Sequence, residues 1–206
     1  MRRSFSVPYF CIFLQSLKPL VSGRFTSNTT KSGENLLNNS SLFWLPKELI
    51  LFNNCNLKRK INFNLSKDSN LLFCENIIFG RTSMKEKFEK GYFSDFWNIN
   101  VDNKLIHTEA INTGLFEKKY LNSFSILNNN SAVATIIIVG NKFLNNINNL
   151  SDTLTNNENT TSNYSHWDNK LIIRLLSKDS YNLKFAIDKI LSYFFEGSKI
   201  PKVWNI

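Results

Sequence analysis

From residue 36 onward, apolar and polar positions mostly alternate, which predicts strands. KRKINFNLS (58–66) alternates apolar and polar side chains, so one face of this segment is expected to be buried and the other exposed to solvent. FWNINVDNKLIHTEA (96–110) repeats the pattern, and Asp102-Asn103 supplies turn chemistry near its centre. We therefore expect a strand over the first segment and a β-hairpin over the second.

Two continuous apolar runs predict strands that are buried on both faces. They are AVATIIIVG (132–140) and KLIIRLLS (170–177), which are rich in β-branched residues or Leu and end at Gly or Ser. The polar, Asn-rich stretch between them (141–169) is predicted to be a loop or a weakly structured excursion. A short helix is expected within residues 116–125.

The period changes near the C-terminus, where a helix is predicted. Asp179 or Ser180 can cap it, and Gly197 followed by Pro201 is expected to end it. Apolar side chains recur three or four residues apart at Leu183, Ile187, Ile190, Leu191 and Phe194. The fold class expected is mostly β: stacked strands, β-helix-like or sandwich-like, with this amphipathic helix packed on the sheet and one further short helix.

Residues 1–35 differ from the rest of the chain. The first 25 residues are basic and contain no acidic residue, and Pro8, Gln15 and Lys18 interrupt their apolar stretch. A membrane span needs ~20 apolar residues, so none is expected. Arg and Ser enrichment without acids is typical of an organellar targeting peptide, whereas the rival readings are a disordered segment or an altered N-terminus of a longer family. A single domain is expected over 36–206.

Composition narrows the function classes. Hydrophobic residues make up 42% of the 206-residue chain and 18 residues are Phe, which predicts a globular protein. The formal charge of +9 is typical of proteins that meet nucleic acid, an anionic membrane or an acidic protein. Cys11, Cys55 and Cys74 are odd in number and widely spaced, which predicts a reducing, cytoplasmic compartment without disulfides.

Catalytic motifs are scarce in this sequence. His107 and His166 lack the spacing of a zinc site, and no phosphate-binding loop or nucleophile elbow is present, so a nucleotide hydrolase is excluded. A hydrolase with Cys55 or Cys74 as nucleophile stays open as a rival, and alkylation would abolish its activity. Both thiols lie in strand-like apolar surroundings, where an inert buried thiol is the commoner case.

Three carboxylates, Glu48, Glu75 and Glu86, stand beside strongly apolar residues. A carboxylate near an interior needs a cation or a wet passage, because burying it unpaired costs ~3 kcal/mol or more. Arg81 is the candidate partner, and Gly80 before it suits a bulge or a positive φ. The rival interpretation makes Arg81 part of a solvated charge run over residues 85–90, and pattern alone favours that rival.

Four segments, taken in order, resemble the urease accessory protein family UreD, also called UreH. That family reads W-x-P-x-E-x-I-x-F, then G-R-x-x-x-G-E-x-F, and ends near P-R-[IV]-W. The matching residues are Trp44, Pro46, Glu48, Ile50 and Phe52, then Gly80, Arg81, Glu86 and Phe88, then Pro201, Val203 and Trp204. Arg174 lies in the third matching segment, IIRLLS (172–177), and the fourth is the terminal PKVW (201–204). The resemblance covers about residues 36–206.

The chain departs from the family pattern at three places. Lys85 stands where the family usually has Gly, and Lys202 replaces the usual Arg of the terminal motif. An early Gly-Gly-Asp hairpin that the family normally carries has no counterpart before residue 36. Any function that rests on that N-terminal portion is therefore in question.

The resemblance implies a β-rich, non-catalytic urease maturation chaperone. It implies that the partners are apo-urease and the UreF and UreG accessory proteins, and that nickel passes in transit without a tightly bound cofactor or metal. The candidates for a metal passage or a partner surface are Glu48, Glu75, Arg81, Glu86 and Glu109. The motif residues expected to be structural are Trp44, Pro46, Phe52, Gly80, Phe88, Arg174, Pro201 and Trp204.

A basic nucleic-acid-binding β-domain without catalysis is the alternative function. Lys58, Arg59 and Lys60 would form its basic strand face, and its affinity would fall steeply with salt. No nucleic-acid motif accompanies the charge, so neither nucleic acid nor a membrane is expected as a partner.

Overall fold

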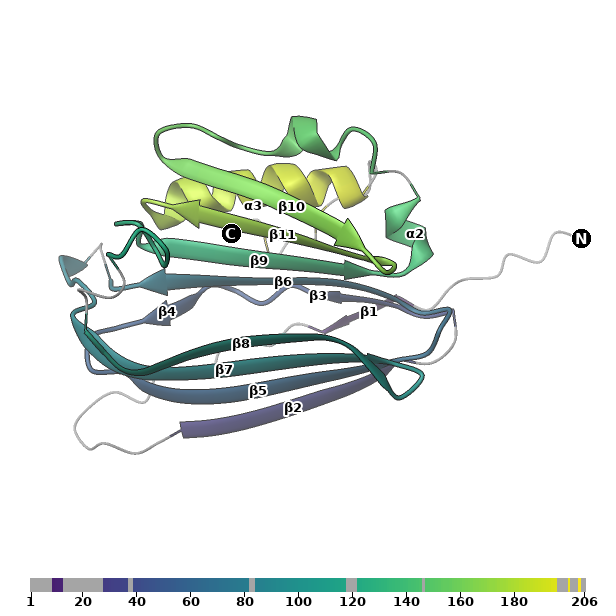
Figure 1. Cartoon of the computed structure of the whole chain (residues 1–206), viewed down its shortest axis with the longest axis horizontal. Coiled ribbons are helices and arrows are strands. Elements are labelled where there is room, and N and C mark those ends of the chain that lie inside the picture. The colour runs from purple at the N-terminus through teal and green to yellow at the C-terminus, as the bar shows by residue number, and fades with distance from the viewer. Residues whose placement is uncertain are drawn as a thin grey trace, which may run out of the picture.

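The computed structural model describes residues 9–12, 28–36, 39–81, 84–117, 122–145, 147–195, 200 and 204 (Figure 1). Over these ranges two β-sheets stack face to face, and a helix covers the outer face of the larger sheet (Figure 1). None of the described helices combines the length and the apolarity that crossing a membrane requires.

The larger sheet has the strand order β1-β3-β6-β9-β11-β10, and β4 also pairs with β6. Its strands are β1 (Tyr9–Ile12), β3 (Ser41–Trp44), β4 (Leu49–Leu51), β6 (Asn70–Phe79), β9 (Ala132–Val139), β10 (Thr160–Trp167) and β11 (Lys170–Ser177). Strands β1, β3 and β4 join β6 through parallel pairings, whereas β9, β11 and β10 continue the sheet in antiparallel fashion.

The smaller sheet has the strand order β2-β5-β7-β8. Its strands are β2 (Asn28–Leu36), β5 (Asn56–Leu65), β7 (Lys90–Val101) and β8 (Lys104–Glu117). The first three are parallel, and β8 returns antiparallel to β7. Because β4, β5, β6 and β7 alternate between the sheets, the chain coils through a sandwich, and the predicted fold class is confirmed.

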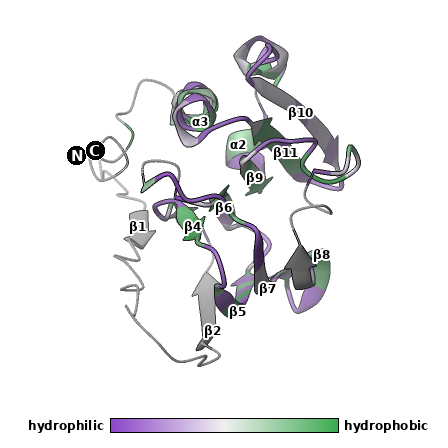
Figure 2. Ribbon diagram, turned by 90° about the vertical axis from the view of Figure 1, so that its left-hand side faces the viewer, coloured by the Kyte–Doolittle hydropathy of each residue, from purple (hydrophilic) through white to green (hydrophobic). Residues whose placement is uncertain are grey.

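Strand β6 is buried on both faces because the larger sheet lies between the smaller sheet and helix α3 (Ser180–Phe195). Leu71 and Phe73 pack with residues of β5 and β7 between the two sheets. Leu72 and Cys74 pack in a second core that includes the buried face of α3. Figure 2 shows the resulting three layers end-on.

Helix α3 confirms the C-terminal prediction. The buried residues include all five predicted apolar positions: Leu183, Ile187, Ile190, Leu191 and Phe194. Asp179 caps the helix, because its Oδ1 accepts a hydrogen bond of 2.8 Å from the Asn182 amide. The predicted stop signals, Gly197 and Pro201, lie outside the described residues.

The predicted hairpin forms between β7 and β8. Asp102 and Asn103 take φ values of 47° and 63°, which is the left-handed geometry of a two-residue hairpin turn. The strands predicted at 58–66, 132–140 and 170–177 correspond to β5, β9 and β11.

The loop predicted over 141–169 is wrong in part. This stretch contains α2 (Asn141–Leu144), the 3₁₀ helix η2 (Leu150–Thr153) and strand β10. Strand β10 escaped prediction because small polar residues occupy its buried positions, Thr160 and Ser162, so apolar alternation does not reveal it. It is a strand because it pairs along the whole of β11.

The second α-helix, α2, does not lie in 116–125, where the sequence predicted one. Residues 116–117 belong to β8 and residues 122–129 form turns. The N-terminal segment 1–35, which was predicted to lie outside the domain, contains strand β1 and most of strand β2. Strand β2 pairs with β5 from Asn28 to Leu36, so it crosses the predicted boundary.

Candidate functional site

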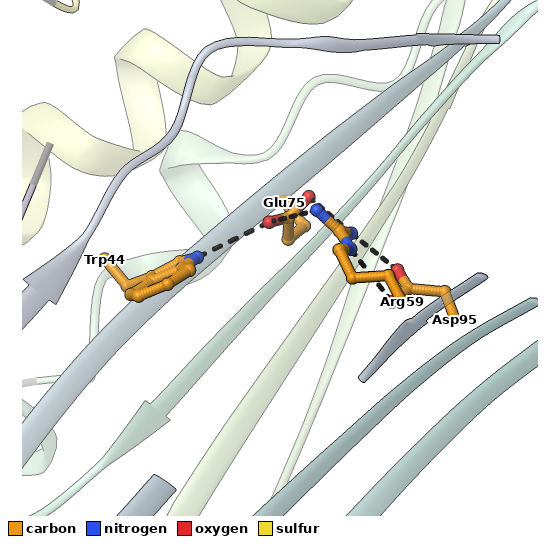
Figure 3. Close-up of polar contacts among 4 residues, drawn as sticks. All are labelled: Trp44, Arg59, Glu75 and Asp95. Carbon is orange, nitrogen blue, oxygen red and sulfur yellow. Dashed lines mark hydrogen bonds and ion pairs between the residues drawn. The ribbon is translucent and has the colours of Figure 1, made fainter. Parts of the chain in front are cut away.

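A buried ionic cluster of Arg59, Glu75 and Asp95 lies between the two sheets (Figure 3). Strand alternation directs each side chain inward, since Glu75 follows Phe73 by two positions and Asp95 precedes Trp97 by two. Phe73 and Trp97 belong to the core between the sheets. We call these three residues the inter-sheet cluster.

Arg59 holds both carboxylates at once (Figure 3). Its Nη1 and Nη2 donate to the two oxygens of Glu75 at 3.1 and 2.9 Å. Its Nε and Nη2 donate to the two oxygens of Asp95 at 3.0 and 2.5 Å. The side chains of Glu75 and Asp95 are 1% and 0% exposed, so this is a desolvated, bidentate arrangement.

The charges of the inter-sheet cluster do not balance, because one guanidinium faces two carboxylates. Burial raises the pKa of Glu75, although Arg59 opposes this effect. Burial alone would lower the pKa of Arg59, but Glu75 and Asp95 outweigh it and raise that pKa, so the guanidinium stays charged. The cluster therefore favours an additional positive charge, supplied by a proton or by a cation.

An interruption of the larger sheet lies directly beside Glu75. Trp44 pairs with Phe73 and Leu49 pairs with Ile77, so four residues of one chain segment oppose three of β6. Pro46 lies in this interruption, and its missing N–H cannot continue a sheet ladder. Glu48 lies there too and is exposed.

Trp44 links the interruption to the inter-sheet cluster (Figure 3). Its indole Nε1 donates to Glu75 Oε1 at 3.4 Å. The ring is buried and packs edge-on against Phe63 at 5.4 Å between centroids. The tryptophan of the first motif therefore orients the cluster carboxylate.

A second polar group crosses the opposite side of the sandwich, between β8 and β11. Arg174 Nη2 donates to Glu109 Oε2 at 2.6 Å, and Arg174 Nη1 reaches Thr135 Oγ1 at 3.4 Å. His107 Nε2 lies 3.5 Å from the same Glu109 oxygen. Burial alone would raise the pKa of Glu109, but the nearby His107 and the hydrogen bond from Arg174 lower it.

Register places Glu75 of the first group and Arg174 of the second at one level of the larger sheet. Glu75 is the partner of Thr135, and Thr135 is the partner of Arg174, across three strands of the larger sheet. In the smaller sheet, Arg59 is the partner of Asp95, and Glu109 is the partner of Trp97, two positions further along β7. Hydrophobic clusters lie on both sides of this level, one with Phe73 and Trp97 and the other with Ile77 and Phe93. We call this level the polar layer.

Arg81 pairs with Glu86 and does not contact Glu75. Its Nε donates to Glu86 Oε2 at 2.9 Å, and its Nη2 bonds the same oxygen. Hydrogen bonds from Arg81 and from the Asn53 amide, the latter at 2.7 Å, lower the pKa of Glu86. The pair lies at the surface, because the Arg81 side chain is 42% exposed.

Gly80 allows the turn that carries Arg81. Its φ is +93°, and a Cβ there would lie 2.8 Å from the Glu86 carbonyl oxygen and 2.9 Å from the Phe88 nitrogen. The Phe52 ring lies 5.3 Å from the Arg81 guanidinium carbon, and Phe88 is buried in the third core cluster. The first two motifs thus meet in one surface structure.

The last motif anchors the C-terminus. Trp204 is buried, and its Nε1 donates to Asp188 Oδ1 of α3 at 2.6 Å. Burial raises the pKa of Asp188 in spite of this hydrogen bond. Pro201 lies outside the described residues.

Sequence reasoning missed Arg59 and Asp95 as site residues. Arg59 was assigned with Lys58 and Lys60 to one basic strand face, but alternation turns Arg59 inward and the two lysines outward. The signal was present, because Arg59 stands two positions before the buried Ile61.

Other chemistry at the described residues is limited. Within the described ranges, no three His, Cys, Asp or Glu side chains gather closely enough to hold a metal ion. Burial raises the pKa of the Cys74 thiol and raises that of Cys55 to about 11. Both thiols are free and buried, so neither is a reactive thiolate near neutral pH.

Comparison with known proteins identifies relatives along most of the chain. The family model described as "UreD urease accessory protein" matches residues 33–205. A urease accessory protein UreD of Rhizobium leguminosarum bv. viciae is 31% identical over 166 residues, covering 79% of this chain and 59% of that protein.

Two further relatives carry the same description. That of Agrobacterium fabrum is 28% identical over 171 residues, covering 81% of this chain and 57% of that protein. That of Granulibacter bethesdensis is 40% identical over 99 residues, covering 48% of this chain and 41% of that protein. The chain thus spans about three fifths of the length of the first curated relatives it matches.

Proposed function

The chain belongs to the UreD family of urease accessory proteins, and from that premise we propose that it is a non-catalytic chaperone of urease maturation. It binds the urease apoprotein together with UreF-type and UreG-type accessory proteins, and it supports the insertion of nickel. The proposed compartment is the cytoplasm. The free thiols of Cys55 and Cys74 agree with a reducing environment.

The polar layer is the observation that carries this proposal. Its carboxylates, Glu75, Asp95 and Glu109, lie between two apolar clusters of the sandwich, and the interruption that holds the exposed Glu48 lies beside Glu75. Oxygen ligands of this kind suit divalent cations in transit, because carboxylates exchange with water and with one another. We propose that nickel follows this layer.

Arg59 makes such a passage a weak metal site. Both carboxylates of the inter-sheet cluster are already engaged by the guanidinium, so an incoming cation competes with a bidentate pair. The same imbalance of one cation and two carboxylates keeps the cluster attractive to positive charge. A conduit needs both properties, since a cation must enter and must also leave.

The alternative functions receive less support from the site. The predicted nucleic-acid-binding surface includes Arg59, but Arg59 points into the sandwich and pairs with Glu75. A hydrolase with a Cys nucleophile is disfavoured because both candidate thiols are buried and have raised pKa values.

Complementation tests the proposed function. The chain is expressed in a host that carries a urease operon without its UreD gene, and urease activity and urease-bound nickel are measured. We expect both to rise above the background of the host without UreD. Two results together would contradict the proposal. The chain would fail to restore urease activity in the host, and the purified, folded chain would bind none of the three partner proteins.

Arg81 offers a test of the surface formed by the first two motifs. Arg81→Ala removes the Glu86 pair and the contact with Phe52 at an exposed position, so the cost in stability should be small, about 1 kcal/mol or less. We expect soluble protein with impaired urease activation in the same host. Activation equal to wild type would show that Arg81 has no role in it.

A further inference from the structure

The outer face of the smaller sheet is rich in lysine and amide side chains. Figures 1 and 2 show that one face of the smaller sheet is turned away from the larger sheet. Alternate residues of β5, β7 and β8 lie on that outer face. We call it the lysine–amide face, and its residues include Tyr92 and Phe96 beside the polar set Lys58, Lys60, Asn62, Asn64, Asn98, Asn100 and Thr108. Lys58, Lys60, Asn64 and Thr108 are exposed.

Hydrogen bonds between neighbouring strands fix the amides of this face. Asn98 Nδ2 donates to Asn62 Oδ1 at 3.1 Å, and Thr108 Oγ1 donates to Asn98 Oδ1 at 3.0 Å. One row further along, Asn100 Nδ2 donates to Asn64 Oδ1 at 3.0 Å. These rows hold their side chains in one conformation before any partner arrives, which lowers the entropy cost of docking.

The charge on this face has a single sign. Lys58 and Lys60 stand two positions apart on β5, so alternation places both on this face. Asp95, the acidic residue of the neighbouring strand segment, points inward and pairs with Arg59. Among the described side chains of the lysine–amide face, none is acidic. The face therefore presents positive charge beside amide side chains that are fixed by hydrogen bonds.

We propose that the lysine–amide face docks against an acidic surface of a protein partner. Charge complementarity identifies the partner chemistry, because an acidic surface pairs with the lysines while its polar groups bond the ordered amides. A nucleic acid fits less well, since the aromatic residues of the same face, Tyr92 and Phe96, are half-buried and offer no stacking platform. The inference rests on the proposed function, in which the partner is a urease maturation protein.

The test uses charge reversal on the intact chain. The variant Lys58→Glu/Lys60→Glu is compared with wild type for binding to purified apo-urease, to the UreF-type protein and to the UreG-type protein, each measured between about 50 and 500 mM salt. Lys178→Glu/Lys189→Glu makes the same change of charge at two exposed lysines elsewhere. Lys58→Gln/Lys60→Gln removes the charges without reversing them. Far-UV circular dichroism and thermal melting confirm that each variant is folded.

We expect the charge reversal to weaken one of the three interactions about tenfold or more at low salt, the Gln variant to weaken it less, and the control to leave it within about twofold. If Lys58→Glu/Lys60→Glu binds every partner of the wild-type chain with unchanged affinity, the proposed docking face is wrong. The proposed function is unaffected by that result. A wild-type chain that binds none of the three would overturn both. The face would be assigned to nucleic acid instead by a different result. In that case the wild type binds a single-stranded oligonucleotide, and Lys58→Glu/Lys60→Glu loses this binding but still binds every protein partner.

Discussion

Arg59 is the residue on which the interior of this sandwich depends. It places a guanidinium between two buried carboxylates, and no other described cation contacts either of them. The free energy of a buried ion pair is asymmetric, since forming it contributes little net stability but removing one partner leaves a charge without water or a counter-ion. The two carboxylates are therefore tolerated in the core only while Arg59 is present.

Substitution of Arg59 tests this dependence. Arg59→Met keeps most of the side-chain volume but strands Glu75 and Asp95, so we expect a loss of about 3–5 kcal/mol in the free energy of unfolding at pH ~7. Burial raises the pKa of Glu75, and removing Arg59 takes away the effect that opposes it. The folded state of the variant therefore binds a proton more tightly than the unfolded state, so the loss shrinks as the pH falls toward about 5. Urea denaturation at both pH values measures the loss in the free energy of unfolding.

The matched control for this substitution is Arg174→Met. Arg174 also pairs with a carboxylate, but its side chain is 55% exposed, so the expected loss is about 1 kcal/mol or less. Equal losses for the two variants would refute the view that burial makes Arg59 special.

Glu109 gives a pH dependence of the opposite sign. Its partners lower its pKa, so the folded state favours the ionised carboxylate. This stabilisation is complete above the ordinary glutamate pKa of about 4.3 and is lost as the pH falls through the lowered value. We expect Glu109→Gln to be less stable than wild type at pH ~7 and the two proteins to converge in more acidic solution. A difference that stays constant with pH would contradict this assignment.

At the scale of elements, the turn after β6 explains a departure from the family pattern. Lys85 stands where the family usually has Gly, and its φ of 57° lies in the left-handed region that favours Gly. The turn is kept because Gly80 and the Arg81–Glu86 pair fix it on either side.

Restoring Gly at this position should stabilise the chain. We expect Lys85→Gly to raise the free energy of unfolding by about 0.5–1 kcal/mol, because relief of the left-handed strain exceeds the entropy that Gly adds to the unfolded state. Lys85→Ala serves as the control, since it keeps the strain and removes only the charge. Equal stability of the Gly and Ala variants, measured by thermal and urea unfolding, would contradict the strain argument.

Strong local patterns were enough to predict the central elements. The apolar alternation of β5, the β-branched runs of β9 and β11, and the helical period of α3 all survive in the structure. Strand β10 could not be predicted, because its side chains are small or polar and its strand conformation depends on pairing with β11. The interruption at Pro46 was visible as a residue, but its place beside Glu75 depends on the register of β6.

At the scale of the whole molecule, the pairing of charges follows from how the sheets stack. Sequence proximity suggested Arg81 as the cation for Glu75 or Glu86, and Arg81 holds the nearer Glu86 at the surface. Glu75 meets Arg59 because β5 and β6 lie in facing sheets and both residues point inward. Strand alternation predicts which face each residue occupies, but only the register of the strands brings a particular cation to a particular carboxylate.

The order of apolar and polar side chains along the sandwich also follows from the register of the strands. Apolar side chains fill the sandwich on both sides of the polar layer, so stability resides in the hydrophobic clusters, while the layer between them is available for function. This division implies that activity and stability can be altered separately at Glu75. Glu75→Gln removes one negative charge while Arg59 keeps its bonds to Asp95.

The most direct test of the central claim is the nickel content of urease matured in the presence of Glu75→Gln. Urease is purified from a host that lacks its own UreD and expresses wild type, Glu75→Gln or the exposed control Glu158→Gln, and nickel per active site is measured beside the melting temperature of each chaperone. We expect Glu75→Gln to melt within a few degrees of wild type, or about 1 kcal/mol, yet to yield urease with at most about a third of the nickel, while Glu158→Gln matches wild type. Full nickel loading by a folded Glu75→Gln chaperone would show that the polar layer is not the route of the metal.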